Sequence, residues 1–122
     1  MIAIIDYGIG NLRSVHNAVS FISPQTKSIV TSDPDVVANA DKVIFPGQGA
    51  MPDCILQLDK RGLKEAVIEA AKQKPFLGIC VGMQLLADHS FENGRHDGLG
   101  WIGGTIKKLP FKNLKLPHMG WN

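Results

Sequence analysis

The sequence predicts an α/β protein built on a doubly wound, mostly parallel sheet. Short apolar runs of the kind found in strands buried on both faces alternate with segments in which apolar residues recur at helical spacing. Glycine or proline follows several of these runs, as at Gly8 and Pro46. The chain has 122 residues, 44% of them hydrophobic and 20% charged, which suits one folded domain.

The expected elements follow from these signals in order. Residues 2–5 form an apolar run that ends at Asp6, and Asn11 then caps a helix with apolar residues at Leu12, Val15, Val19 and Ile22. The remaining expected elements are a strand at 28–31, a helix beginning at 32–35, a strand at 42–45, helices at 51–58 and 63–73, a strand at 76–80, a helix beginning over 83–87, and a strand around 102–109.

Several classes of protein are excluded by composition. No apolar run approaches the ~18 residues of a membrane span, and the opening MIAIIDYG does not resemble a secretory leader. Cys54 and Cys80 are too far apart for a CxxC motif and too few for a disulfide scaffold. We therefore expect a cytoplasmic protein that does not associate with a membrane.

The net charge of +2 is unevenly spread along the chain. Basic residues accumulate late, at Lys107, Lys108, Lys112 and Lys115, with no arginine among them. We expect no nucleic-acid partner from this pattern. The lysines are interpreted as a solvated face, with an acidic partner surface or a nearby phosphorylated substrate as the alternative.

A dinucleotide site after the first strand is not supported. Gly8-Ile9-Gly10 resembles the start of the glycine fingerprint, but Arg13 stands where the third glycine belongs. The glycines are explained by a tight turn that leads into a capped helix. We expect no cofactor and no metal site.

The strongest local signal is Gly78-Ile79-Cys80-Val81-Gly82, a cysteine version of the nucleophile elbow. A strand turns directly into a helix there, and the flanking glycines let the neighbouring backbone pass close by. The helix start favours a thiolate, and the amide of Val81 is free to point at an oxyanion. The alternative is a buried, inert cysteine on a core strand. We interpret Cys80 as the nucleophile and Cys54 as structural.

The turn Pro46-Gly47-Gln48-Gly49 follows the third predicted strand. A glycine-rich turn at this end of a parallel strand presents backbone N–H groups to the ligand cleft. Beside the elbow, it would supply the second oxyanion donor. This functional interpretation depends on that of Cys80.

The chain resembles the class I glutamine amidotransferases along its whole length. The resemblance is carried by GICVGMQLL around Cys80, the PGQG turn, the opening IIDYGIGNLRSV and the closing LPHMGWN. The opening and closing motifs are more narrowly similar to the glutaminase subunits of imidazole glycerol phosphate synthase, in histidine biosynthesis. The resemblance implies a flavodoxin-like fold.

The resemblance also implies an enzyme and its partners. Cys80 would attack the side-chain amide of L-glutamine, giving a thioester and ammonia. Backbone N–H groups of Val81 and the turn would bind the oxyanion, and ammonia would pass to a cyclase subunit with a (β/α)8 barrel. Gly49 and Gln84 match positions that hold the substrate, and the oxyanion turn comprises Gly47, Gln48 and Gly49. The face that binds the partner would include Asn11 and the closing segment up to Asn122, with His118 and Trp121.

Two features depart from the family pattern. Gln48 replaces a valine in the oxyanion turn, a mild change where backbone amides do the chemistry. The base and its orienting group come, in this family, from a His-x-Glu pair downstream of PHMGWN, and none of His16, His89, His96 and His118 is a natural substitute.

We therefore expect residues 1–122 to be the N-terminal portion of a single amidotransferase domain whose C-terminal part is missing. Such a chain would be inactive or nearly so by itself, and its uncovered sheet edge would favour association. The alternative from another class is a non-catalytic or redox-sensing module with an elbow cysteine, of the DJ-1-like type.

Overall fold

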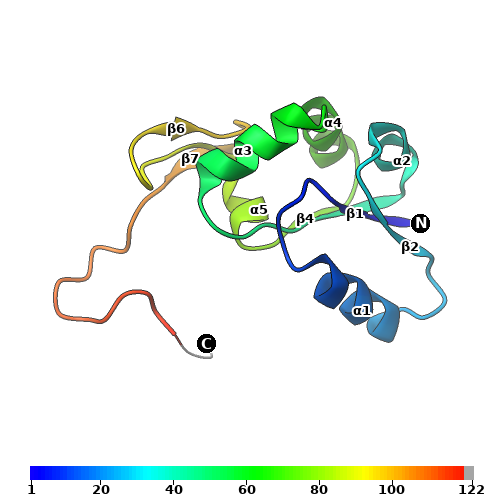
Figure 1. The fold of residues 1–122 in the computed structure, drawn as a ribbon, viewed down its shortest axis with the longest axis horizontal. Coiled ribbons are helices and arrows are strands. Elements are labelled where there is room, and N and C mark those ends of the chain that lie inside the picture. The colour runs from blue at the N-terminus through cyan, green and yellow to red at the C-terminus, as the bar shows by residue number, and fades with distance from the viewer. Residues whose placement is uncertain (120–122) are drawn as a thin grey trace.

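The computed structural model of the chain describes residues 1–119, so the predictions for Trp121 and Asn122 lie outside the described residues. Helices and strands alternate from the N-terminus, as expected (Figure 1). Their bounds are β1 Ile2–Ile5, α1 Leu12–Ile22, β2 Ser28–Thr31, α2 Pro34–Asn39, β3 Lys42–Phe45, α3 Met51–Lys60, α4 Lys64–Gln73, β4 Phe76–Gly78, α5 Val81–Gln84, β5 Ala87–Ser90, β6 His96–Asp97 and β7 Ile102–Ile106.

The main sheet has four parallel strands in the order β2-β1-β3-β4. Helix α1 lies on one face of it, and α2, α3 and α4 lie on the other (Figure 1). The prediction of a doubly wound parallel sheet is therefore confirmed. Because the strands are parallel, the turns that follow β1, β3 and β4 all emerge at the same edge.

The first two helices begin as their caps predict. The side chain of Asn11 accepts a hydrogen bond from the backbone N–H of Ser14 at 3.2 Å. Asp33 accepts one from the N–H of Asp35 at 2.9 Å, with a proline in the first turn of α2.

The hydrophobic core is one-sided. Ala3, Ile5, Val43 and Phe45 face α2, α3 and α4 and belong to one buried cluster. Alternation along the strands turns Ile4 toward the opposite face. Helix α1 covers that face with no fully buried residue of its own, and Ile22, expected on its apolar stripe, is 80% exposed.

The prediction of a helix continuing over 83–87 is wrong. Helix α5 ends at Gln84, and the chain continues as strand β5 of a second sheet with the order β6-β5-β7. The carbonyls of Leu85 and Leu86 accept hydrogen bonds from the N–H groups of Leu99 at 2.7 Å and Trp101 at 2.9 Å. Pairing with a distant segment thus replaces the next helical turn.

Two strand ends also shift, and one short strand was not expected. Strand β4 ends at Gly78 rather than at Cys80, because the chain turns at the elbow. His96, expected in a loop, forms the short strand β6 and pairs with Ser90, and β7 ends at Ile106 rather than near 109.

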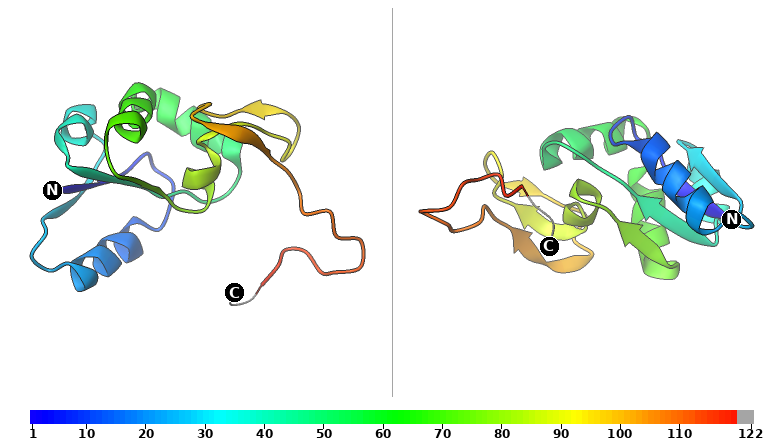
Figure 2. Two further views of the ribbon diagram at one scale, coloured as in Figure 1. Left: turned by 180° about the vertical axis from the view of Figure 1, so that it is seen from behind. Right: turned by 90° about the horizontal axis from the view of Figure 1, so that it is seen from below.

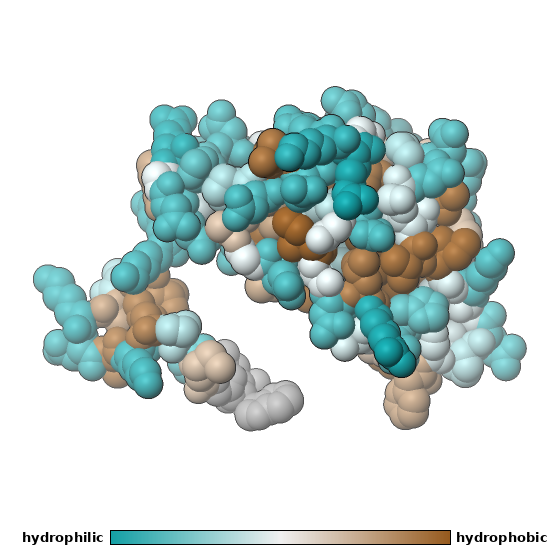
Figure 3. Space-filling view, viewed as in Figure 1, coloured by the Kyte–Doolittle hydropathy of each residue, from teal (hydrophilic) through white to brown (hydrophobic). Residues whose placement is uncertain are grey.

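Residues 107–119 form an arm that extends away from the body of the molecule (Figure 2). Its apolar side chains are exposed, including Phe111 at 50% and Met119 at 85%. Strand β4 lies at the sheet edge, where Leu77 is 55% exposed. Apolar side chains reach the surface both on the body and on this arm (Figure 3). Among residues 1–119, no helix is long and apolar enough to cross a membrane.

The core predicts a contrast between two leucines of α3. Leu58 is fully buried, whereas Leu56 is 49% exposed on the same helix. Replacing Leu58 with alanine is expected to lower the free energy of unfolding by about 2–5 kcal/mol, because it leaves a cavity. The same change at Leu56 should cost less than about 1 kcal/mol. Urea denaturation of the two variants measures the difference, and equal losses would contradict this core.

Candidate active site

Three turns meet at the C-terminal edge of the main sheet. The β1 turn, the Pro46–Gly49 turn after β3 and the elbow after β4 lie beside one another. A Cβ placed on Gly10 would lie 3.5 Å from the Cβ of Pro46, and one on Gly47 would lie 2.6 Å from the backbone N of Gly82. The edge expected to hold the ligand is thus built from the predicted turns.

The elbow has the geometry that its glycines predict. Cys80 has φ 56° and ψ −119°, a backbone conformation that non-glycine residues rarely adopt, and its residue is exposed. Gly78 lies so close to α5 that a Cβ added to it would be 2.6 Å from the Cα of Met83. Helix α5 begins directly after Cys80 and makes a single turn. The alternative of Cys80 as a buried residue on a core strand is excluded by this placement.

The register of the sheet brings the Pro46–Gly49 turn against the elbow. Phe45 pairs with Gly78, and the N–H of Ile79 donates to the carbonyl of Phe45 at 3.0 Å. A Cβ on Gly82 would clash with that same carbonyl oxygen, and a Cβ on Gly47 would lie 3.2 Å from the carbonyl carbon of Val81. The turn and the start of α5 therefore touch through their backbones.

Buried side chains hold the turn from below. The hydroxyl of Tyr7 donates a hydrogen bond to the carbonyl of Pro46 at 2.8 Å. The thiol of Cys54, on α3, donates to the carbonyl of Gln48 at 3.5 Å. Burial raises the pKa of the Cys54 thiol and, more strongly, that of Tyr7.

Sequence reasoning missed these contacts of Tyr7 and Cys54. It interpreted Cys54 as structural, but had no way to place it under Gln48. The position of Cys54 in the sequence could have indicated the contact, because Cys54 lies in the first turn and a half of the helix that follows Gln48.

Gln84 has an unpartnered polar atom on the same short helix as Val81. Its side-chain Oε1 is buried, and no hydrogen-bond partner for it lies among residues 1–119. A buried acceptor without a donor is unusual in a folded protein. This side chain is thus a candidate for contact with a bound ligand.

A protein-family comparison matches residues 8–115 to the CobB/CobQ-like glutamine amidotransferase domain. The chain belongs to this family. The match includes the elbow and the Pro46–Gly49 turn, and it favours an amidotransferase over the redox-sensing alternative.

Curated relatives of this amidotransferase chain carry the name imidazole glycerol phosphate synthase subunit HisH. The protein from Dechloromonas aromatica is 55% identical over 129 residues, which cover 99% of this chain and 60% of the relative. Those from Nitrosospira multiformis and Neisseria gonorrhoeae are 52% and 55% identical, covering 99% and 98% of this chain and 60% and 61% of the relatives. The chain thus spans about 60% of the length of the curated relatives it matches.

Two histidines of the amidotransferase chain have partners away from the elbow. His89 lies on β5, not on a helix, and its Nε2 is 3.1 Å from the hydroxyl of Thr105. The Nε2 of His96 is 2.8 Å from the carbonyl oxygen of Asn93. His16 lies on α1 and His118 on the arm, so the four histidines are dispersed.

The predicted partner-face residues lie in different parts of the molecule. Asn11 is exposed at the start of α1, next to the turn that holds Gly10. His118 is exposed on the arm beyond β7. No cluster of metal-ligating side chains occurs within the described part of the chain.

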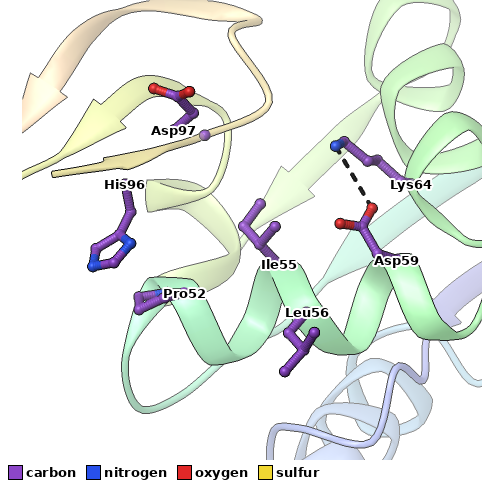
Figure 4. A pocket seen from close by; sticks show the side chains of 8 residues that line it. Pro52, Ile55, Leu56, Asp59, Lys64, His96 and Asp97 are labelled. Atoms are coloured by element: carbon purple, nitrogen blue, oxygen red, sulfur yellow. Dashed lines mark ion pairs between the residues drawn. The ribbon is translucent and has the colours of Figure 1, made fainter.

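A pocket of about 380 Å³ lies away from the elbow, between α3 and β6 (Figure 4). The ion pair of Asp59 and Lys64, 3.6 Å apart, stands at one end of it, and His96 stands at the other. The pocket is lined by Pro52, Ile55, Leu56, Asp59, Lys64, His96, Asp97 and Gly98. Cys80 is not among these residues and lies exposed at the edge of the main sheet.

The contact between Gly82 and β3 predicts a sharp steric effect. Gly82→Ala places a methyl group on the backbone carbonyl of Phe45, which cannot rotate away. We expect a loss of at least about 2 kcal/mol of unfolding free energy and displacement of Cys80. Gly103→Ala is the matched control, because nothing lies within 4 Å of its Cβ position. Thermal denaturation compares the two, and equal stability would contradict the close approach.

Proposed function

We propose that this chain carries the nucleophile and the oxyanion site of a glutaminase, the amidotransferase subunit of imidazole glycerol phosphate synthase. The observation that carries the proposal is the elbow, with Cys80 exposed at positive φ directly beside the Pro46–Gly49 turn. The match to a glutamine amidotransferase domain supports the choice of substrate, and the name shared by its relatives supports the choice of the synthase.

The proposed reaction begins with the sulfur of Cys80. The thiolate attacks the side-chain amide carbon of L-glutamine, and the carbonyl oxygen becomes an oxyanion. Collapse of this intermediate breaks the C–N bond, and the departing nitrogen takes a proton to leave as ammonia. Water then hydrolyses the γ-glutamyl thioester, releasing glutamate and regenerating the thiol.

Backbone amides are proposed to stabilise the oxyanion. The N–H of Val81 lies at the start of α5, where no preceding turn of the helix offers a carbonyl to accept a hydrogen bond from it. The turn Gly47-Gln48-Gly49 is in contact with this position and supplies the second donor. Because main-chain groups do this work, glutamine at position 48 is compatible with it.

Gln84 and Gly49 are proposed to hold the substrate. The Oε1 of Gln84 is buried and has no hydrogen-bond partner among residues 1–119, and it is an acceptor suited to the α-ammonium group of glutamine. Gly49 has φ 82°, and open space lies where its Cβ would be. A substrate can therefore approach this backbone closely.

The proposed partner is a cyclase subunit with a (β/α)8 barrel, which consumes the ammonia. Asn11 is exposed at the sheet edge that carries the elbow, so it is suitably placed for docking there. His118, on the arm, and Trp121, outside the described residues, are proposed to take part as well. The base and its orienting carboxylate are proposed to lie in the part of the relatives that this chain does not match. The free thiols suit the proposed cytoplasmic location.

Alkylation by the glutamine analogue diazo-oxonorleucine tests the substrate. We expect labelling at Cys80 alone, slowed by excess glutamine, as mapped by mass spectrometry. Cys54 is the internal control, because it is buried and its thiol pKa is raised. The Cys80→Ala variant should take up no label. Labelling of Cys80 that excess glutamine does not slow would contradict the proposal.

Complementation tests the missing base. Adding the C-terminal part of the Dechloromonas aromatica relative, together with the cyclase, should raise glutamate release by at least about 10²-fold, the usual contribution of a general base. The Cys80→Ala chain in the same mixture should stay at background. Turnover by that variant would refute Cys80 as nucleophile.

A further inference from the structure

Two buried donors lie directly beneath the oxyanion turn. Tyr7 and Cys54 both have no exposed surface. Tyr7 comes from the β1 turn and bonds the carbonyl of Pro46 at 2.8 Å, whereas Cys54 comes from α3 and bonds the carbonyl of Gln48 at 3.5 Å. The two donors therefore hold alternate carbonyls of one short turn.

The carbonyl directions determine where the amides point. In a planar trans peptide, the N–H lies on the side opposite to the C=O of the same unit. Holding the carbonyls of Pro46 and Gln48 toward the core therefore turns the N–H groups of Gly47 and Gly49 away from it. Those are two of the amides in the turn proposed to receive the oxyanion.

Tyr7 is also part of the contact between the turn and the elbow. A Cβ on Gly47 would lie 2.6 Å from the Tyr7 oxygen and 2.6 Å from the backbone N of Gly82. The Tyr7 hydroxyl and the start of α5 therefore both approach Gly47 at the position that a side chain would occupy. The Tyr7 ring is itself held against Phe45, with ring centroids 5.3 Å apart.

Both donors keep their protons at neutral pH. Burial raises the pKa of Tyr7 well above its usual range and also raises that of Cys54. Each group can therefore act as a constant hydrogen-bond donor.

We propose that Tyr7 and Cys54 are positioning residues that hold the Pro46–Gly49 turn with its amides directed at the oxyanion formed on Cys80. They do not touch the substrate. This inference rests on the proposed glutaminase function and adds the side chains that orient its oxyanion site.

Tyr7→Phe removes the hydroxyl and keeps the ring against Phe45. We expect the maximal rate of Cys80 alkylation by diazo-oxonorleucine to fall about tenfold, because one buried hydrogen bond is lost. The concentration of the analogue that gives half of the maximal rate should change little. Alkylation by iodoacetamide, which does not need the oxyanion site, should be unchanged. Cys54→Ala should give the same pattern with a smaller loss, because a thiol is a weak donor.

Val67→Ala is the matched control for a loss of buried volume, since Val67 is fully buried on α4. It should leave the ratio of the two alkylation rates at the wild-type value. Hydrogen–deuterium exchange gives a second readout that needs no substrate. The peptide spanning residues 46–50 should exchange faster in Tyr7→Phe but not in Val67→Ala.

The failures of the two proposals differ. If wild-type Cys80 shows no glutamine-protected labelling, the proposed glutaminase function is wrong and this inference falls with it. If wild type is labelled and Tyr7→Phe reacts at the same rate with unchanged exchange, the function stands and the positioning role is overturned. If Tyr7→Phe slowed alkylation by iodoacetamide as much as alkylation by the glutamine analogue, the positioning role would also be overturned, because equal slowing indicates a general structural loss.

Discussion

The close approach of the elbow backbone to the end of β3 is the constraint on which the site depends. Gly82 lies against the carbonyl of Phe45, which also accepts a hydrogen bond from the N–H of Ile79 at 3.0 Å. A side chain at position 82 would push the start of α5 off the sheet. With hydrogen there, the helix begins directly after Cys80 and the thiol stands exposed at the sheet edge.

The same approach brings the Pro46–Gly49 turn and the elbow together. The backbone N of Gly82 and the Tyr7 hydroxyl both lie 2.6 Å from the position that a Cβ on Gly47 would occupy. Through Tyr7 and Cys54, the buried core is therefore bonded directly to the Pro46–Gly49 turn at the sheet edge. Main-chain amides make a precise oxyanion site only if the peptide units that carry them cannot rotate, and holding those units is the role proposed for the buried hydrogen bonds to their carbonyls.

The second sheet and the C-terminal arm lie outside this contact between the elbow and β3. Strand β5 of the second sheet contacts α5, and the chain from 107 to 119 extends as an exposed arm. Apolar side chains on β4 and on the arm are exposed. The chain corresponds to about 60% of its curated relatives, and the proposed base and cyclase both lie outside it.

The sequence by itself determined the order of elements as far as β4, the helix cap at Asn11, the start of a helix at 32–35 and the elbow at Cys80, because these are set by residues close together in the chain. Only the tertiary structure decided that the helix after Cys80 stops at Gln84, since its end depends on pairing with residues 99–102. It also decided that Tyr7 and Cys54 lie under Pro46 and Gln48. Those contacts follow from sheet register and helix packing, which local pattern does not encode.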